Sequence, residues 1–227
     1  MKKPARKYPE DTVDLTLMNR RLNHRLRNFC TGMQMVVQAI ETYPQDQAKI
    51  LEKCPLVQAE LDRLMTLTRR LDLLFEVLPP AAEMSVADLM ENARFEFAHD
   101  FPLCNLDIDA PLTKGPLSGG GMLDIALKEL LANAGTAAGV DGSVTLRWDV
   151  ESGDTICITN TGEQLPDDLA IDPPVPFASN RSRHDGIGLA IVHRVLNTID
   201  ARWTIRNNAD HTVTASICLE KGAASHE

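Results

Sequence analysis

The first eighty residues carry apolar side chains at the spacing of two long helices. Steps of three and four residues separate the apolar positions of the first stripe, Leu15, Met18, Leu22, Leu26, Phe29, Met33, Val36 and Ile40. Pro44 ends it, and a second stripe follows at Ile50, Cys54, Val57, Leu61, Leu64, Leu67, Leu71, Leu74 and Leu78. Such spacing is typical of coiled coils and helix bundles. Pro55 lies inside the second stripe and predicts a kink or a restart there.

Two helices of about 30 residues, each about 45 Å long, form a helical hairpin when a short loop joins them. A single hairpin cannot bury both stripes, whereas two hairpins bury them in a four-helix bundle. We therefore expect residues 13–80 to form a homodimer through this hairpin. Residues 1–12 are expected to be a flexible basic arm.

Helix and strand patterns alternate after Pro79 and Pro80. Apolar periodicity predicts helices over residues 81–101, 122–138 and 187–199, and alternation predicts strands near residues 105–109, 143–150, 154–159, 202–207 and 212–219. The fold class expected for the whole chain is α+β. An α/β sandwich domain over residues 81–222 follows the hairpin, and residues 223–227 form a tail.

Two glycines mark the start of the last predicted helix, in Asp185-Gly186-Ile187-Gly188-Leu189. Without side chains at Gly186 and Gly188, the backbone can approach a ligand, and the N–H groups of the first helical turn suit phosphate. The same pattern also fits an ordinary tight turn. The loop before it, residues 163–185, contains four prolines and is long enough to be a lid.

Two further stretches carry candidate chemistry. Glu129 and Asn133 are four residues apart and share one helix face, where the amide oxygen could bind Mg²⁺ and the carboxylate could accept a proton. Two polar groups facing solvent would have the same spacing.

His24 lies two residues after Leu22, about 200° around the first helix, and should point away from the stripe. Arg25, Arg27 and Asn28 surround it with donors for phosphate, and a neutral imidazole is a competent nucleophile near pH 7. An ordinary surface histidine would look alike.

Composition narrows the classes of protein to which the chain could belong. The chain has 227 residues and a net charge of -9, with only 4% aromatic residues, which disfavours nucleic-acid binding. Residues 1–30 are nevertheless basic, with eight Lys or Arg against three Asp or Glu. The five cysteines form no CxxC pair, which argues against a zinc site or a disulfide framework. No run is apolar enough to insert into a membrane and no signal peptide is visible, so a cytoplasmic location is expected.

In chain order, four stretches resemble the motifs of sensor histidine kinases of two-component signalling. Their nucleotide domain has the Bergerat-type fold shared with gyrase-type ATPases and Hsp90. Residues 23–28 resemble the phosphoacceptor box, residues 128–134 the N box, residues 160–162 the first glycine box and residues 185–189 the second. The resemblance implies that ATP and Mg²⁺ bind, that His24 is phosphorylated, that Asn133 is a Mg²⁺ ligand and that Glu129 is the helper carboxylate. Phe177 falls where a lid aromatic is common.

The chain departs from the family pattern at several positions. Asn160 replaces the usual Asp that accepts a hydrogen bond from adenine, and Gln164 replaces a glycine. Thr136 stands where a basic residue often meets phosphate, and Arg181 or Arg183 of the lid could substitute for it. Arg25 stands where an acidic residue is common, and the helix-kinking proline of the phosphoacceptor box is absent.

The function implied is that of a dimeric histidine kinase that passes phosphate from His24 to an aspartate of a response-regulator receiver domain. Asn28, one helical turn later, could position a water for a phosphatase reaction. A histidine phosphotransferase or scaffold with a degenerate nucleotide domain is the alternative. An ATPase or serine kinase of the same fold would lack the hairpin. No sensor domain is visible, so a separate sensor protein or a longer chain is expected to supply the signal.

Overall fold

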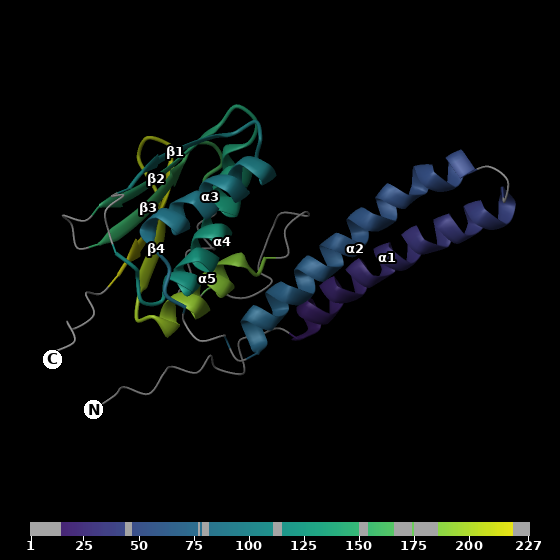
Figure 1. Cartoon of the computed structure of the whole chain (residues 1–227), viewed down its shortest axis with the longest axis horizontal. Coiled ribbons are helices and arrows are strands. Elements are labelled where there is room, and N and C mark those ends of the chain that lie inside the picture. Colours follow the sequence, from purple (N-terminus) through teal and green to yellow (C-terminus); the bar gives the residue numbers. More distant parts are fainter. Residues whose placement is uncertain are drawn as a thin grey trace. The chain divides into compact units, whose positions relative to one another are not determined.

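The computed structural model describes residues 15–43, 47–76, 78, 82–110, 115–149, 154–165, 174 and 186–219. They belong to two compact units, one of Met1–Val77 with Val175–Ile187 and the other of Leu78–Pro174 with Gly188–Glu227. Figure 1 shows a helical hairpin in the first unit and a sheet with three helices in the second. The predicted α+β class is confirmed.

The hairpin consists of α1 (Leu15–Thr42) and α2 (Gln47–Phe75), which run side by side (Figure 1). Gly32 of α1 is buried where the two helices meet, and a Cβ there would lie in ordinary van der Waals contact with Cγ2 of Val57, at 3.7 Å. The α2 helix continues through Pro55, so the restart that the sequence allowed does not occur.

The apolar stripe of α1 divides into two sets of side chains. Leu22, Phe29 and Val36, seven residues apart, are half-buried. A second set with the same spacing is more open, with exposed fractions of 39% at Leu26, 41% at Met33 and 46% at Ile40. One chain therefore leaves part of the stripe uncovered.

The sheet of the second unit has the strand order β1-β2-β3-β5-β4. Its strands are β1 (Asn105–Asp109), β2 (Ser143–Asp149), β3 (Thr155–Asn160), β4 (Arg202–Asn207) and β5 (Val213–Cys218). The β1 and β2 strands pair in parallel, and every other pair is antiparallel. The β3 strand is thus central.

Three helices, α3 (Val86–Asp100), α4 (Gly120–Ala138) and α5 (Gly188–Thr198), lie along one face of this sheet (Figure 1). Alternation along the strands explains why: every second residue of β2 is buried, whereas Thr145 and Arg147 between them are exposed. The opposite face is polar, and there the hydroxyls of Thr159 and Thr214 lie 2.9 Å apart. The core therefore lies between the sheet and the helices.

The α4 helix is at the centre of that core. It contacts α3, α5, β2 and β3. Its buried apolar residues include Met122, Leu123, Ala126, Leu127, Leu130, Leu131 and Ala134. A helix that is apolar on most sides is stable only when it is covered on most sides. Among the described residues, no helix combines the length and apolar character needed to cross a lipid bilayer.

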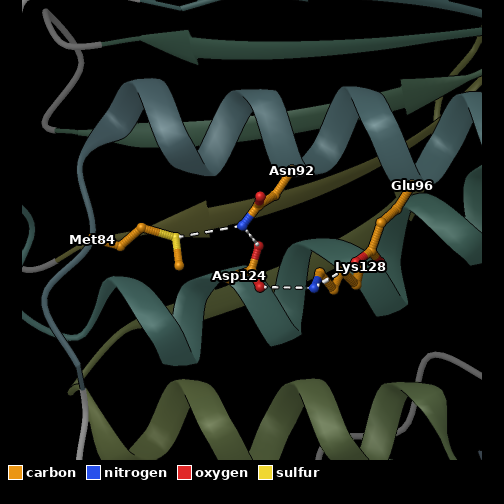
Figure 2. A network of polar contacts seen from close by, with 5 residues as sticks. All are labelled: Met84, Asn92, Glu96, Asp124 and Lys128. Atoms are coloured by element: carbon orange, nitrogen blue, oxygen red, sulfur yellow. Dashed lines mark hydrogen bonds and ion pairs between the residues drawn. The ribbon is translucent and has the colours of Figure 1, made fainter.

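A polar network ties α4 to α3 (Figure 2). The ammonium of Lys128 lies 2.7 Å from Glu96 Oε1 and 2.9 Å from Asp124 Oδ2. Asn92 donates to the other oxygen of Asp124 at 3.4 Å and to the sulfur of Met84 at 3.9 Å. Burial works to lower the pKa of Lys128, but the bonds to Glu96 and Asp124 outweigh it and raise that pKa above 10.5.

Replacing Lys128 with methionine is expected to lower the free energy of unfolding by about 2 kcal/mol, because Asp124 would keep only its contact with Asn92. The cost stays below that of breaking a fully buried pair, since the Lys128 side chain is 35% exposed. A raised pKa contributes stability that is complete below the unfolded value and is lost as the pH rises through the folded value. The difference should therefore shrink above pH 10.5.

Urea unfolding at pH 7 and at about pH 11 measures both effects. Arg147→Met is a matched control in the same unit, because Arg147 and Asp109 are 3.7 Å apart and well exposed. It should cost about 0.5 kcal/mol or less. Equal losses in the two variants would contradict a special role for Lys128.

Candidate functional site

Asn160 is the polar residue of an otherwise apolar part of the sheet. It ends β3, between Val144 of β2 and Val213 of β5. The next two rows across the same three strands are apolar: Leu146, Ile158 and Ala215, then Trp148, Ile156 and Ile217. Asn160 is only 5% exposed. A polar side chain so placed requires hydrogen-bond partners.

The main chain supplies one partner for the Asn160 carboxamide. Its Nδ2 donates to the carbonyl oxygen of Thr161 at 2.9 Å. Because a carbonyl oxygen can only accept, the amino end of the carboxamide must face it. Within the described parts of the chain, no donor reaches the other end, Oδ1. The strand therefore ends in an acceptor atom, on a largely buried side chain, that a ligand donor could satisfy.

Gly162 holds the next segment against the end of α4. Its φ is +103°, in the region that favours glycine, and a Cβ there would collide with the carbonyl oxygen of Ala137. That same oxygen accepts the N–H of Glu163 at 3.1 Å. Only a residue without a side chain permits this approach.

Glu129 and Asn133 are both half-buried on α4, one helical turn apart. Ala137 follows at the same spacing, so the three residues share one helix face. At the end of this face, the carbonyl oxygen of Ala137 accepts the N–H of Glu163. Thr136 lies on this last turn, and its hydroxyl donates to the carbonyl of Ala132 at 2.8 Å. Position 136 thus provides no cation and no free hydroxyl proton.

The second glycine motif begins α5. Gly186 has a φ of +71°, Gly188 is buried as the first residue of the helix, and Leu189 is half-buried. The α5 helix packs against α4. Asp185, and the predicted lid residues Phe177, Arg181 and Arg183, lie outside the described residues.

The candidate nucleophile belongs to the hairpin. His24 and Arg27 are exposed on α1, and Asn28, one turn after His24, is half-buried. The α1 backbone at Arg25 is described, but its side chain is not. Within its own unit, the imidazole of His24 is therefore exposed, and a reactant can reach it.

Sequence reasoning missed two sets of contacts, one in the site and one beside it. The carbonyl of Thr161, which orients Asn160, carries no sequence signal because every residue has one. The network of Lys128, next to Glu129, also went unnoticed; the spacing of Asp124 and Lys128 by four residues was the available clue. Glu96 could not be found this way, because it comes from another helix.

By sequence, no protein-family model matches the chain, and no curated protein matches it. By structure, it resembles the Acinetobacter baumannii histidine kinase AdeS, with a TM-score of 0.62 and 19% identity over 87% of this chain and 97% of that one. It also resembles histidine kinase ThkA, solved in complex with response regulator protein TrrA, with a TM-score of 0.68 and 17% identity over 92% of this chain and 62% of that one.

A shorter match is to a mycobacterial sensor histidine kinase, MprB, with a TM-score of 0.52 and 16% identity over 60% of this chain and 95% of that one. The fold of this chain is thus the fold of histidine kinases. The resemblance proposed from the four motifs is confirmed at the level of the fold.

Gly162→Ala is expected to destabilise the chain by at least about 3 kcal/mol, because strain from a positive φ adds to a collision with Ala137. Gly139→Ala is the matched control: its φ is +72°, but nothing lies within 4 Å of a Cβ there. The control should cost less, about 1 to 2 kcal/mol, because it carries the strain of a positive φ without the collision. Thermal unfolding gives the losses, and hydrogen exchange at the Glu163 amide reports the local contact. Similar losses for both variants would refute the close approach.

Proposed function

We propose that this chain is an ATP-dependent protein histidine kinase of two-component signalling. In this proposal His24 is phosphorylated, and the phosphoryl group passes to an aspartate of a response-regulator receiver domain. The observation that carries the proposal is the unengaged acceptor Oδ1 of Asn160 beside the close contact of Gly162 with α4. The fold shared with histidine kinases, one of them solved with a response regulator, supports it.

The residues fit an adenine nucleotide. A purine amino group can donate to Oδ1 of Asn160, and its strand neighbours Val144 and Val213 are apolar, so they present no competing polar group. The segment at Gly162 brings the backbone close to α4, and the N–H groups at Gly188 and Leu189 in the first turn of α5 suit phosphate oxygens. Phe177 is proposed to cover the base, and Arg181 or Arg183 to supply the cation that Thr136 does not.

A single protein ligand for Mg²⁺ is proposed, the side-chain oxygen of Asn133. The described residues contain no group of three His, Cys, Asp or Glu side chains that could hold a metal. A single protein ligand is compatible with Mg²⁺, which is often bound by one or two protein groups together with substrate phosphates. The ion would neutralise phosphate charge during transfer.

The proposed chemistry is phosphoryl transfer to nitrogen. A ring nitrogen of His24 attacks the γ-phosphorus in line, the new P–N bond forms as the bond to the leaving oxygen breaks, and ADP departs. Glu129 is proposed to accept the imidazole proton. Positioning and charge neutralisation supply most of the rate. A receiver carboxylate then takes the phosphoryl group from His24.

Incubation with γ-labelled ATP and Mg²⁺ should label the protein, in a form that is lost in acid and kept in alkali. His24→Ala should abolish the label. His99→Ala is the matched control, because His99 is also exposed, on α3, and should keep full labelling. Label that survives in His24→Ala would rule out the proposed acceptor.

We propose that the chain dimerises through the hairpin, since Leu26, Met33 and Ile40 remain open in one chain. Met33→Glu would place a charge in the buried interface and should shift the protein to monomers. Gln34→Glu adds the same charge at the neighbouring exposed residue and should leave dimers intact. Sedimentation gives the masses. A Met33→Glu protein that remains dimeric would place the interface elsewhere.

Asn28 is proposed to position a water that removes phosphate from the regulator, because it lies one turn from His24 on α1. Asn28→Ala should slow dephosphorylation of the phosphorylated regulator by about tenfold or more while His24 labelling continues. Thr31→Ala, in the next turn, is the control. Unchanged dephosphorylation would remove this role.

A histidine phosphotransferase with a degenerate nucleotide domain is the second candidate. The engaged hydroxyl of Thr136 favours it, because no phosphate-binding cation stands at that position of α4. Such a protein would bind no ATP and would gain phosphate on His24 from a phosphorylated receiver. The labelling experiment, repeated with a phosphorylated receiver as donor, separates the two candidates.

A further inference from the structure

We propose that Asn160 makes the nucleotide site tolerant of the purine base, so that inosine triphosphate binds only modestly more weakly than ATP. Adenine carries an amino group at position 6, which donates hydrogen bonds, whereas hypoxanthine carries an oxygen there, which accepts them. The inference rests on the proposed function, and it concerns which bases that site admits.

In the row of the sheet formed by Val144, Asn160 and Val213, a single side chain can distinguish one base from another by hydrogen bonding. Val144 and Val213, the neighbours of Asn160 on either side, have apolar side chains and are 0% and 4% exposed. Being apolar, they present neither a donor nor an acceptor that could distinguish one base from another. Discrimination by this row therefore depends on the carboxamide of Asn160 alone.

The carboxamide has a direction, and one hydrogen bond sets it. Nδ2 donates to the carbonyl oxygen of Thr161 at 2.9 Å, which leaves Oδ1 to accept from an amino group. If the carboxamide turned by half a rotation, Nδ2 would face the ligand and could donate to a 6-oxo group. The bond to Thr161 is lost, and the side chain must also turn away from the Thr161 carbonyl oxygen, because Oδ1 would otherwise face another acceptor. A carboxylate at this position would have no donor to offer in either orientation.

The size of the preference follows from that one bond. A neutral hydrogen bond contributes on the order of a tenfold change in an equilibrium constant. A site whose only polar group is a fixed acceptor rejects the wrong partner by a much larger factor, on the order of hundredfold or more. We therefore expect ATP to be preferred over inosine triphosphate by about tenfold in this chain.

Competition against a ribose-labelled fluorescent ATP analogue, with Mg²⁺ and the full chain, measures both affinities. The ratio should be about tenfold in the wild type and should rise to about hundredfold or more in Asn160→Asp. Thr159→Val is the control, because Thr159 lies on the same strand but on the opposite, polar face of the sheet. Its ratio should match the wild type.

The outcomes separate this inference from the proposed function. ATP binding with inosine triphosphate weaker by about a thousandfold would overturn the inference and leave the kinase proposal standing. An unchanged ratio in a folded Asn160→Asp protein would overturn it as well. If the Asp variant does not fold, the wild-type ratio alone decides. Failure of ATP itself to bind would overturn both.

Discussion

The sheet domain depends on the packing of α4 against its central strands. The helix is apolar on most sides and is covered by α3, α5, β2 and β3. Its last turn accepts the N–H of Glu163 and leaves no room for a Cβ at Gly162. The chain leaving β3 is therefore held on the helix. Asn160, two residues before Gly162, is thereby held at the end of β3, next to the apolar rows of the sheet.

Periodicity predicted the elements whose burial follows a simple repeat. The alternation of β3 and the apolar faces of α1 and α4 were visible in the sequence, because a buried face leaves a regular pattern. Pro55 shows the limit of local rules. It removes one helical hydrogen bond, yet α2 continues through it and packs along α1 as a single helix.

The candidate site was predictable as a set of residues but not as an arrangement. Glu129 and Asn133 were found by their helical spacing, and Asn160 and Gly162 by resemblance, which depends on residue types in order. The direction of the Asn160 carboxamide depends on a main-chain carbonyl, and the contact of Lys128 with Glu96 joins two helices. Both arise from proximity in space. The roles of His24 and Asn28 stay predictions, because they concern reactions rather than contacts.

The acceptor at the end of β3 also has a consequence for acidic conditions. A carboxylic acid in this place would take up a proton in acid, and its hydroxyl would then donate where the ionised group accepts. The side chain of Asn160 has no such titration. Buried beside Val144 and Val213, it keeps the same polarity at every pH at which the domain remains folded.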